Sequence, residues 1–131
     1  MNPPDSTLRR RQPDAGGDIG VVGPCGSGKT TLVMALRGLG VAPHQIAQEH
    51  SHVADMWRRV ARPARLVFLD ASFATCTERK RFDWPAADYR EQQRRLEHAR
   101  RECDVFIQTD GLTPQAVVEQ VVRALAALPR R

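Results

Sequence analysis

Residues 19–32 read IGVVGPCGSGKTTL, and this stretch decides the fold that the sequence predicts. Its first four residues are apolar apart from one glycine and indicate a short buried strand. The segment that begins at Lys29 places Leu32, Leu36 and Leu39 on one side, which predicts a helix over residues 29–37. A glycine-rich turn separates the two, so the stretch predicts a strand–turn–helix unit.

The turn carries two glycines, Gly23 and Gly28, with four residues between them, and Lys29 and Thr30 follow. Glycines let the backbone curl until successive N–H groups point inward, and the helix N-terminus adds its dipole, so the arrangement binds phosphate. We expect Lys29 to be exposed and to reach the β- and γ-phosphates of a nucleoside triphosphate, while the Thr30 hydroxyl ligates Mg²⁺. The expected nucleotide-binding residues are Gly23, Pro24, Cys25, Gly26, Ser27, Gly28, Lys29, Thr30 and Thr31. The alternative is a glycine-rich turn without a ligand.

Beyond the turn, short apolar runs alternate with helical patterns. Strands are expected at 44–48, 65–70 and 104–108, and helices at 52–61, 83–103 and 114–128. This alternation predicts an α/β fold: a three-layer α/β/α sandwich with a parallel sheet of four or five strands, formed by residues 19–131. Residues 1–18 hold three prolines, a Gly-Gly pair and no apolar period, so we expect a disordered tail there.

The loop sequence GPCGSGKTTL resembles the P-loop nucleoside triphosphate hydrolase superfamily. The short insertions resemble its kinase branch, which includes the shikimate, gluconate, adenylylsulfate and nucleoside-monophosphate kinases. Two further segments carry this resemblance: LVFLD at 66–70, followed by Arg79 and Arg81, and VFIQTDG at 105–111. The chain is also similar to small bacterial P-loop proteins with a Gln-Glu-His-Ser segment, here 48–51, a likeness that implies no activity.

The resemblance implies the P-loop fold, ATP or another nucleoside triphosphate with Mg²⁺, and phosphate transfer to a small molecule. In such kinases the strand like 66–70 leads into an arginine-bearing lid, and the strand like 105–108 precedes the last helix. Only 35 residues separate Thr30 from Leu66, which leaves little room for the usual acceptor-binding insertion.

Asp70 ends an apolar strand, where P-loop enzymes place a carboxylate that organises Mg²⁺. We expect Asp70 to join Thr30 at the metal. The alternatives are that Asp70 caps the turn after the strand, or that Glu49 or Asp55 supplies the carboxylate.

Glu49 and His50 follow an expected strand and should emerge at the carboxyl end of the sheet, near the γ-phosphate. There they could act as acid–base groups or hold the acceptor. The alternatives are a surface turn and a zinc site built on His50 and His52, for which no third ligand has suitable spacing.

Arg79 and Arg81 precede an arginine-rich helix, and with Arg90 they are placed to clamp phosphate oxygens. Elsewhere in this helix Glu91 with Arg95 and Glu97 with Arg101 stand at i,i+4 spacing, which is typical of a solvated face. The expected catalytic set is Lys29, Glu49, His50, Asp70, Arg79 and Arg81.

The composition narrows the class of partner. A net charge of +5 favours an anionic partner, but only 5% of residues are aromatic and none alternate with basic ones, so nucleic acid is not expected. Three cysteines without metal spacing suit a reducing cytoplasm, and the longest apolar run is far short of the roughly 20 residues that span a membrane. Two functions remain: a kinase-like phosphotransferase, or a nucleotide-binding regulatory or partner-binding module without transfer chemistry.

Overall fold

The computed structural model describes residues 18–81 and 83–129. The strands are β2 (Asp18–Val22), β3 (Ala42–Gln45), β4 (Arg65–Asp70) and β5 (Val105–Gln108). The helices are α1 (Lys29–Gly38), α2 (Phe73–Lys80), α3 (Ala86–Arg95), α4 (Glu97–Glu102) and α5 (Pro114–Ala127), with a 3₁₀ turn η1 (Gln48–His50) and a π-helical turn η2 (Trp57–Ala61). The predicted tail lies outside the described residues except for Asp18, which begins β2.

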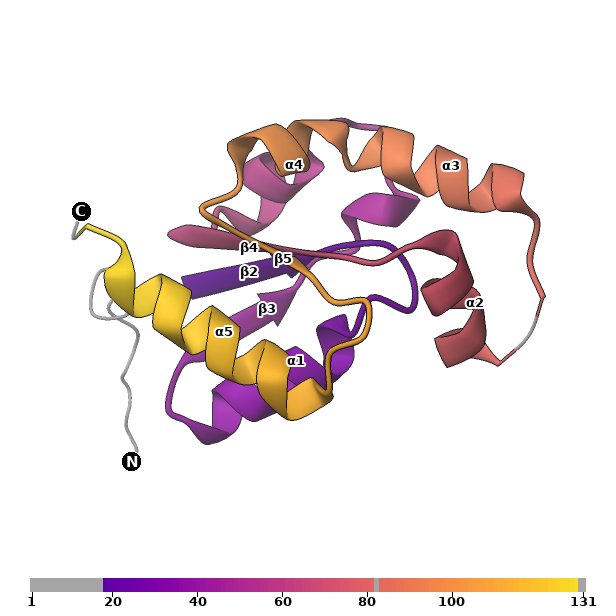
Figure 1. Cartoon of the computed structure of the whole chain (residues 1–131). Helices are drawn as coiled ribbons and strands as arrows, with labels where there is room; N and C mark the ends of the chain where they lie inside the picture. The colour runs from indigo at the N-terminus through magenta and orange to yellow at the C-terminus, as the bar shows by residue number, and fades with distance from the viewer. Residues whose placement is uncertain (1–17, 82, 130–131) are drawn as a thin grey trace, which may run out of the picture.

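The four strands form one parallel sheet in the order β3-β2-β4-β5. Helices α1 and α5 cover one face of this sheet, and α3 and α4 cover the other (Figure 1). The prediction of an α/β fold with a four-stranded parallel sheet between helices is therefore confirmed. The carboxyl ends of all strands meet at one edge of the sheet, where the glycine-rich turn lies.

Strand β4 shows how the two faces of the sheet are filled. Because side chains alternate along a strand, Val67 and Leu69 join the core under α1 and α5, whereas Leu66 and Phe68 join the core under α3 and α4. All four side chains are at most 1% exposed, as expected for a strand covered on both faces. Asp70 continues this alternation and falls on the α3/α4 face.

Three expected elements differ from the structure. The edge strand β3 begins at Ala42 rather than residue 44 and contains Pro43, a residue that edge strands tolerate. Residues 52–61 form a helical turn only from Trp57 onward, and the expected helix over 83–103 is divided at Leu96. Helix α2 was not predicted as a helix.

Within residues 18–81 and 83–129, no helix has both the length and the apolar character needed to cross a membrane.

Candidate functional site

The turn between β2 and α1 adopts the conformation that its glycines allow. Gly26 and Gly28 have φ values of 87° and 105°, in the left-handed region that side chains disfavour. In the described part of the chain, no acceptor meets the backbone N–H groups of Gly28, Lys29 and Thr30 at the start of α1. The turn therefore presents free donors at a helix N-terminus, which suits an anion.

Lys29 is buried, contrary to the expectation that it would be exposed. The residue is 5% exposed, and its Nζ donates to the carbonyls of Gly23 (2.7 Å) and Pro24 (3.1 Å). Its third partner is the carboxylate of Glu49, with Nζ and Oε2 3.1 Å apart. The ammonium is buried because the turn wraps around it and η1 supplies a counter-charge.

A cavity of about 670 Å³ opens beside the turn, within the size range of small-ligand sites. Its lining residues come from the turn and α1, from β3 and η1, and from the segment after β5. They are Cys25, Gly26, Ser27, Gly28, Lys29, Thr30, Thr31, Leu32, Gln45, Ala47, Glu49, His50, Arg79, Leu112, Pro114 and Val117. Most of the expected nucleotide-binding residues are thus brought together with Glu49 and His50.

Two buried side-chain oxygens of the described residues have no hydrogen-bond partner, Ser27 Oγ and Glu49 Oε1. Both residues line the cavity. A buried oxygen without a partner costs free energy, commonly about 1–3 kcal/mol. These two atoms therefore mark the place where a bound group would supply the missing partners.

Thr30 lines the cavity, and its hydroxyl donates to Gln45 Oε1 at 3.1 Å. Gln45 ends β3 and was not among the expected site residues.

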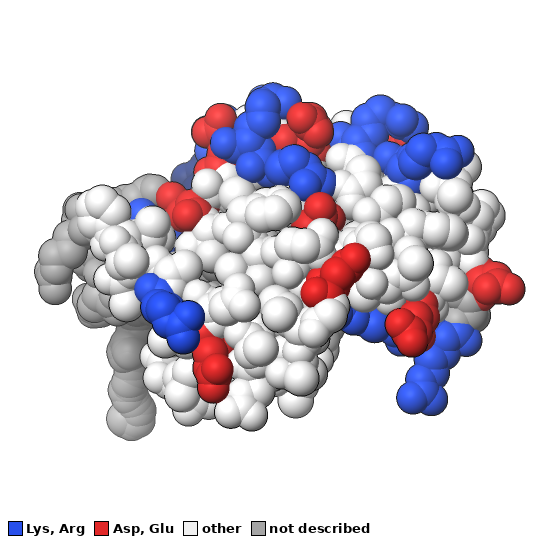
Figure 2. Space-filling model, in the orientation of Figure 1, with Lys and Arg blue, Asp and Glu red and all other residues white. Residues whose placement is uncertain are grey.

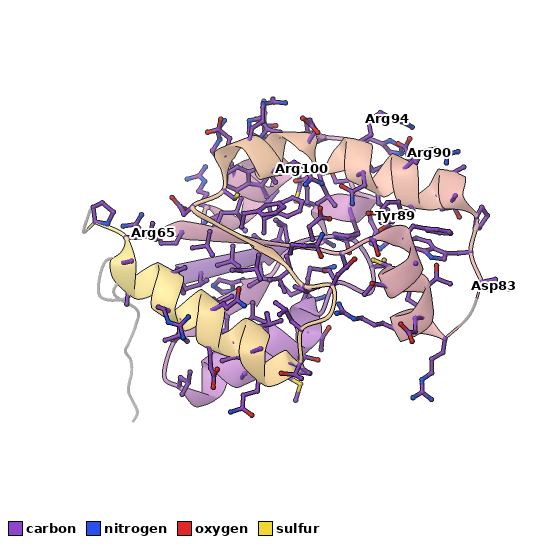
Figure 3. The ribbon with its side chains drawn as sticks, in the orientation of Figure 1. Arg65, Asp83, Tyr89, Arg90, Arg94 and Arg100 are labelled. Carbon is purple, nitrogen blue, oxygen red and sulfur yellow. The ribbon has the colours of Figure 1, made fainter. Side chains whose placement is uncertain are left out.

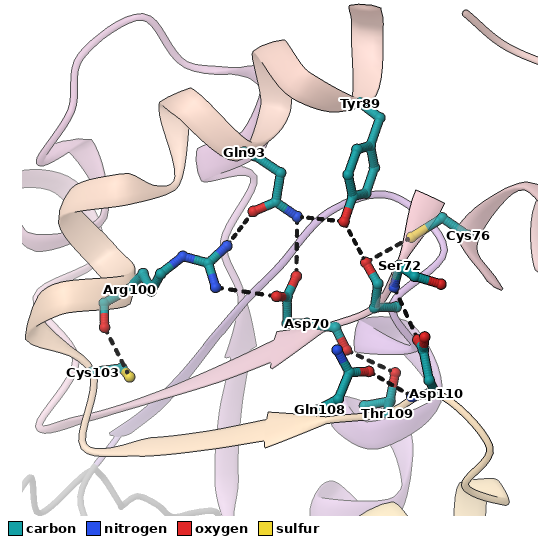
Figure 4. Close-up of polar contacts among 11 residues, drawn as sticks. Asp70, Ser72, Cys76, Tyr89, Gln93, Arg100, Cys103, Gln108, Thr109 and Asp110 are labelled. Atoms are coloured by element: carbon teal, nitrogen blue, oxygen red, sulfur yellow. Dashed lines mark hydrogen bonds and ion pairs between the residues drawn. The ribbon is translucent and has the colours of Figure 1, made fainter. Parts of the chain in front are cut away.

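Asp70 lies elsewhere. Its carboxylate accepts from Gln93 Nε2 (3.0 Å) and pairs with Arg100 Nη1 (3.1 Å), and Gln93 also donates to the Tyr89 hydroxyl (Figure 4). Asp70 is absent from the cavity lining because strand alternation turns it toward α3 and α4. The structure does not bring Asp70 to Thr30.

The three arginines expected at the phosphates are placed differently. Arg79 lines the cavity, but its guanidinium donates to the carbonyls of Gly26, Ser27 and Thr109 and to the Thr109 hydroxyl, at 2.8 to 3.3 Å. Arg79 therefore stabilises the conformation of the turn through these hydrogen bonds. Arg81 is exposed at the end of α2 and does not line the cavity.

Arg90 points outward from α3, as does Arg94, whereas Arg100 points toward the sheet (Figure 3). Basic and acidic side chains mix over α3 and α4 (Figure 2), and Glu91–Arg95 and Glu97–Arg101 form the expected i,i+4 pairs. This surface is a solvated, charge-paired face rather than a wall of the cavity.

Two buried polar residues that support the turn were missed. Gln92 accepts from the Cys25 N–H at 3.0 Å and donates to Cys25 Sγ at 3.2 Å. The Thr109 hydroxyl lies within hydrogen-bonding distance of a loop carbonyl, that of Ser27 (3.2 Å), and of a strand carbonyl, that of Asp70 (3.0 Å), and can donate its one proton to either. Thr109 could have been found from the sequence, because it directly follows an expected strand. Gln92 lies in a highly charged helix, and no sequence feature marks it as a site residue.

The environment shifts the pKa of several groups near the turn. Burial raises the pKa of the Cys76 thiol to about 11, so this cysteine stays protonated near neutral pH. Burial also raises the pKa of the Tyr89 hydroxyl. The backbone N–H of Ser72 donates to Asp110 at 2.9 Å and lowers the pKa of that carboxyl.

Neither a scan against models of protein families nor a search of curated proteins found a match for this chain.

Proposed function

We propose that this protein binds a nucleoside triphosphate, ATP in the first instance, with Mg²⁺ as a member of the P-loop superfamily, and that it is a kinase-like phosphotransferase acting on a small molecule. The observation that carries the proposal is the buried ammonium of Lys29, held at a turn whose neighbouring N–H groups have no described acceptor. A lysine point charge beside free helix-terminal donors is the arrangement that cradles phosphates.

The residues around the turn fit the phosphates. Gly28 lines the cavity, and a Cβ added there would meet no atom within 4 Å, so this side of the turn is open to a ligand. Ser27 Oγ has a vacant hydrogen-bonding capacity in the same wall. Because Glu49 holds Lys29 in this structure, a triphosphate would compete with that carboxylate for the ammonium.

Oxygen donors suited to Mg²⁺ lie in the same cavity. Thr30 and Gln45 are already in contact, and Glu49 offers one carboxylate oxygen without a partner. Magnesium prefers such oxygen ligands and, when bound, would neutralise charge on the phosphates. Glu49, an alternative that the sequence left open, is therefore better placed than Asp70 to supply the carboxylate.

Part of the cavity lining is apolar. Leu112, Pro114 and Val117 come from the segment after β5, whereas the polar residues Glu49 and His50 come from η1. An apolar surface beside a phosphate cradle suits a nucleobase, which leaves His50 and Glu49 on the side where an acceptor could bind.

The second candidate is a nucleotide-binding module without transfer chemistry. It is favoured by Arg79, whose guanidinium is bound to loop carbonyls and Thr109 instead of standing free for a transferring phosphate.

One experiment separates these functions. Pure protein is incubated with γ-labelled ATP, Mg²⁺ and a library of small hydroxylated and phosphorylated metabolites, and label transfer is compared with label release. Transfer to one compound supports the kinase, whereas MgATP binding without transfer or release supports the module. Absence of triphosphate binding would contradict both.

Thr30→Ala is expected to weaken the Mg²⁺ dependence of nucleotide binding more than nucleotide binding itself, because only the hydroxyl reaches the metal. Calorimetric titrations of ATP at a series of Mg²⁺ concentrations measure this dependence. Thr30→Ser keeps the hydroxyl and serves as the control. An unchanged Mg²⁺ titration in the alanine variant would remove Thr30 from the metal site.

Glu49→Gln is expected to lower phosphate transfer or hydrolysis by about 10²-fold, the scale of one positioned acid–base group. Affinity for ATP measured without Mg²⁺ should rise, since the amide competes less strongly for Lys29 than the carboxylate does, whereas the gain in affinity on adding Mg²⁺ should be smaller. Single-turnover assays and ATP titrations measure the two effects. Glu97→Gln, an exposed glutamate paired with Arg101, is the control and should change neither. Unchanged turnover in Glu49→Gln would leave Glu49 a structural partner of Lys29.

A further inference from the structure

Three side chains of different chemistry meet at the mouth of the turn: the thiol of Cys25, the carboxylate of Glu49 and the imidazole of His50. Cys25 Sγ lies 3.6 Å from His50 Nε2 and 4.0 Å from Glu49 Oε2, and these nitrogen and oxygen atoms are 3.7 Å apart. We propose that Cys25, Glu49 and His50 form a site for a thiophilic divalent cation, Zn²⁺ in the first instance.

The spacing of the three atoms matches a tetrahedral zinc ion. With Zn–S near 2.3 Å and Zn–N and Zn–O near 2.1 Å, tetrahedral angles place sulfur about 3.6 Å from nitrogen or oxygen, and nitrogen about 3.4 Å from oxygen. The distances in the structure differ from these by about 0.4 Å or less. Small side-chain movements would therefore close the site around the metal.

The donor set distinguishes this site from a magnesium site. Thiolate and imidazole are ligands of zinc and its neighbours, whereas magnesium takes oxygen. Gln92 Nε2 donates to Cys25 Sγ at 3.2 Å, so the sulfur already has the kind of outer hydrogen bond that orients a metal ligand.

Glu49 can serve this site without being stripped from Lys29. The residue is 3% exposed, and Oε2, the oxygen that faces Cys25 and His50, is also the one that pairs with Lys29, so a cation bound there would share this carboxylate with the ammonium. Oε1 has no hydrogen-bond partner, so the carboxylate has a second oxygen to divide between the two cations. Lys29 would also keep the carbonyls of Gly23 and Pro24. A buried carboxylate that lies beside a thiol and an imidazole, with one oxygen that no hydrogen bond satisfies, favours a bound cation.

The metal has a route to the site and room for a fourth ligand. The His50 side chain is 59% exposed, and all three ligands line the cavity, so water could complete the coordination from the cavity side. Three protein ligands with an open fourth position is the arrangement of metal sites that exchange ligands. The site shares Glu49 with the proposed nucleotide and magnesium site, but it uses the side chain of Cys25 and not the backbone N–H groups of the turn, so it can be tested without nucleotide.

The test uses the full chain, reduced and without a histidine tag, and titrates Co²⁺ as a spectroscopic substitute for Zn²⁺ in nucleotide-free buffer. We expect one Co²⁺ per chain, with a sulfur-to-cobalt charge-transfer band and the strong visible bands of tetrahedral cobalt, all displaced by Zn²⁺. Cys25→Ser should abolish the charge-transfer band, and His50→Ala should weaken Co²⁺ binding by about 100-fold. His50 is exposed, so its replacement should leave the melting temperature unchanged.

Two variants serve as matched controls: Cys103→Ser, a half-buried cysteine outside the cavity, and His52→Ala, an exposed histidine two residues from His50. Both should bind Co²⁺ as the parent does. A charge-transfer band that survives Cys25→Ser, or is lost in Cys103→Ser, would overturn the proposal, as would the absence of any such band in the parent. Since no nucleotide is present, these outcomes are separate from failure of the triphosphate site.

Discussion

Lys29→Ala is expected to lower triphosphate affinity by about 10²-fold or more and also to destabilise the fold. The affinity falls because the variant lacks the ammonium that would meet the β- and γ-phosphates. The fold is destabilised because Glu49, 3% exposed, is left as a buried carboxylate without its cation. Removing one partner of a buried ion pair costs about 3–5 kcal/mol, which should lower the melting temperature by on the order of 10 °C.

The two effects can be separated in the same chain. Lys29→Met combined with Glu49→Gln removes both charges, so it should recover most of the lost stability without recovering affinity. Lys80→Ala replaces the other lysine, which lies over the Trp84 ring, and should leave affinity unchanged. Thermal melts and ATP titrations measure these results. A Lys29→Ala protein that binds MgATP as tightly as the parent would refute the phosphate-binding role of the turn.

Gly23→Ala is expected to destabilise the protein by about 3 kcal/mol, the upper end for overpacked sites. An added Cβ would lie 2.1 Å from the Leu69 carbonyl oxygen and 2.7 Å from Ser27 Oγ. The Leu69 carbonyl cannot move aside, because it belongs to β4, which is hydrogen-bonded to β2 and β5. Urea unfolding and thermal melting measure the loss.

Gly38→Ala is the matched control. Gly38 ends α1, and a Cβ there would meet nothing within 4 Å, so alanine should leave stability unchanged or raise it by up to about 1 kcal/mol. Equal stability of the two alanine variants would mean that β4 does not approach Gly23 as closely as the structure has it.

The sequence predicted those elements in which local pattern and tertiary packing agree. The apolar run 65–70 is a strand over the same residues, since burial on both faces requires a continuous apolar stretch. Helix α5 begins as its cap predicts: the Thr113 side chain accepts from the Ala116 N–H, and Pro114 occupies the first turn.

Helix α2 shows what local pattern could not reveal. It buries only Cys76, so it lacks the apolar period by which helices are recognised. The one signal was Ser72, whose side chain caps the helix by accepting from the Thr75 N–H, and a capping serine alone also fits a turn.

The environment of Lys29 was missed for a different reason. Lysine is almost never buried unless it is paired, and its partner Glu49 stands 20 residues away in the chain. Likewise, the face of the sheet on which the Asp70 side chain lies depends on which face of β4 packs against α3. A strand that is apolar on both faces does not reveal this from its sequence. The sequence thus predicted which residues lie near the turn more accurately than it predicted which side chains form ion pairs or hydrogen bonds with each other.

Arg79 has a consequence that follows from the planarity of the peptide bond. The Ser27 carbonyl oxygen accepts from Arg79 Nη1, and the N–H of Gly28 belongs to the same rigid plane and must point the opposite way. The guanidinium therefore fixes the direction of a donor that it never contacts. This peptide group loses its rotational freedom when the chain folds. The Gly28 N–H is therefore already oriented before an anion binds, and binding costs less conformational entropy of the protein.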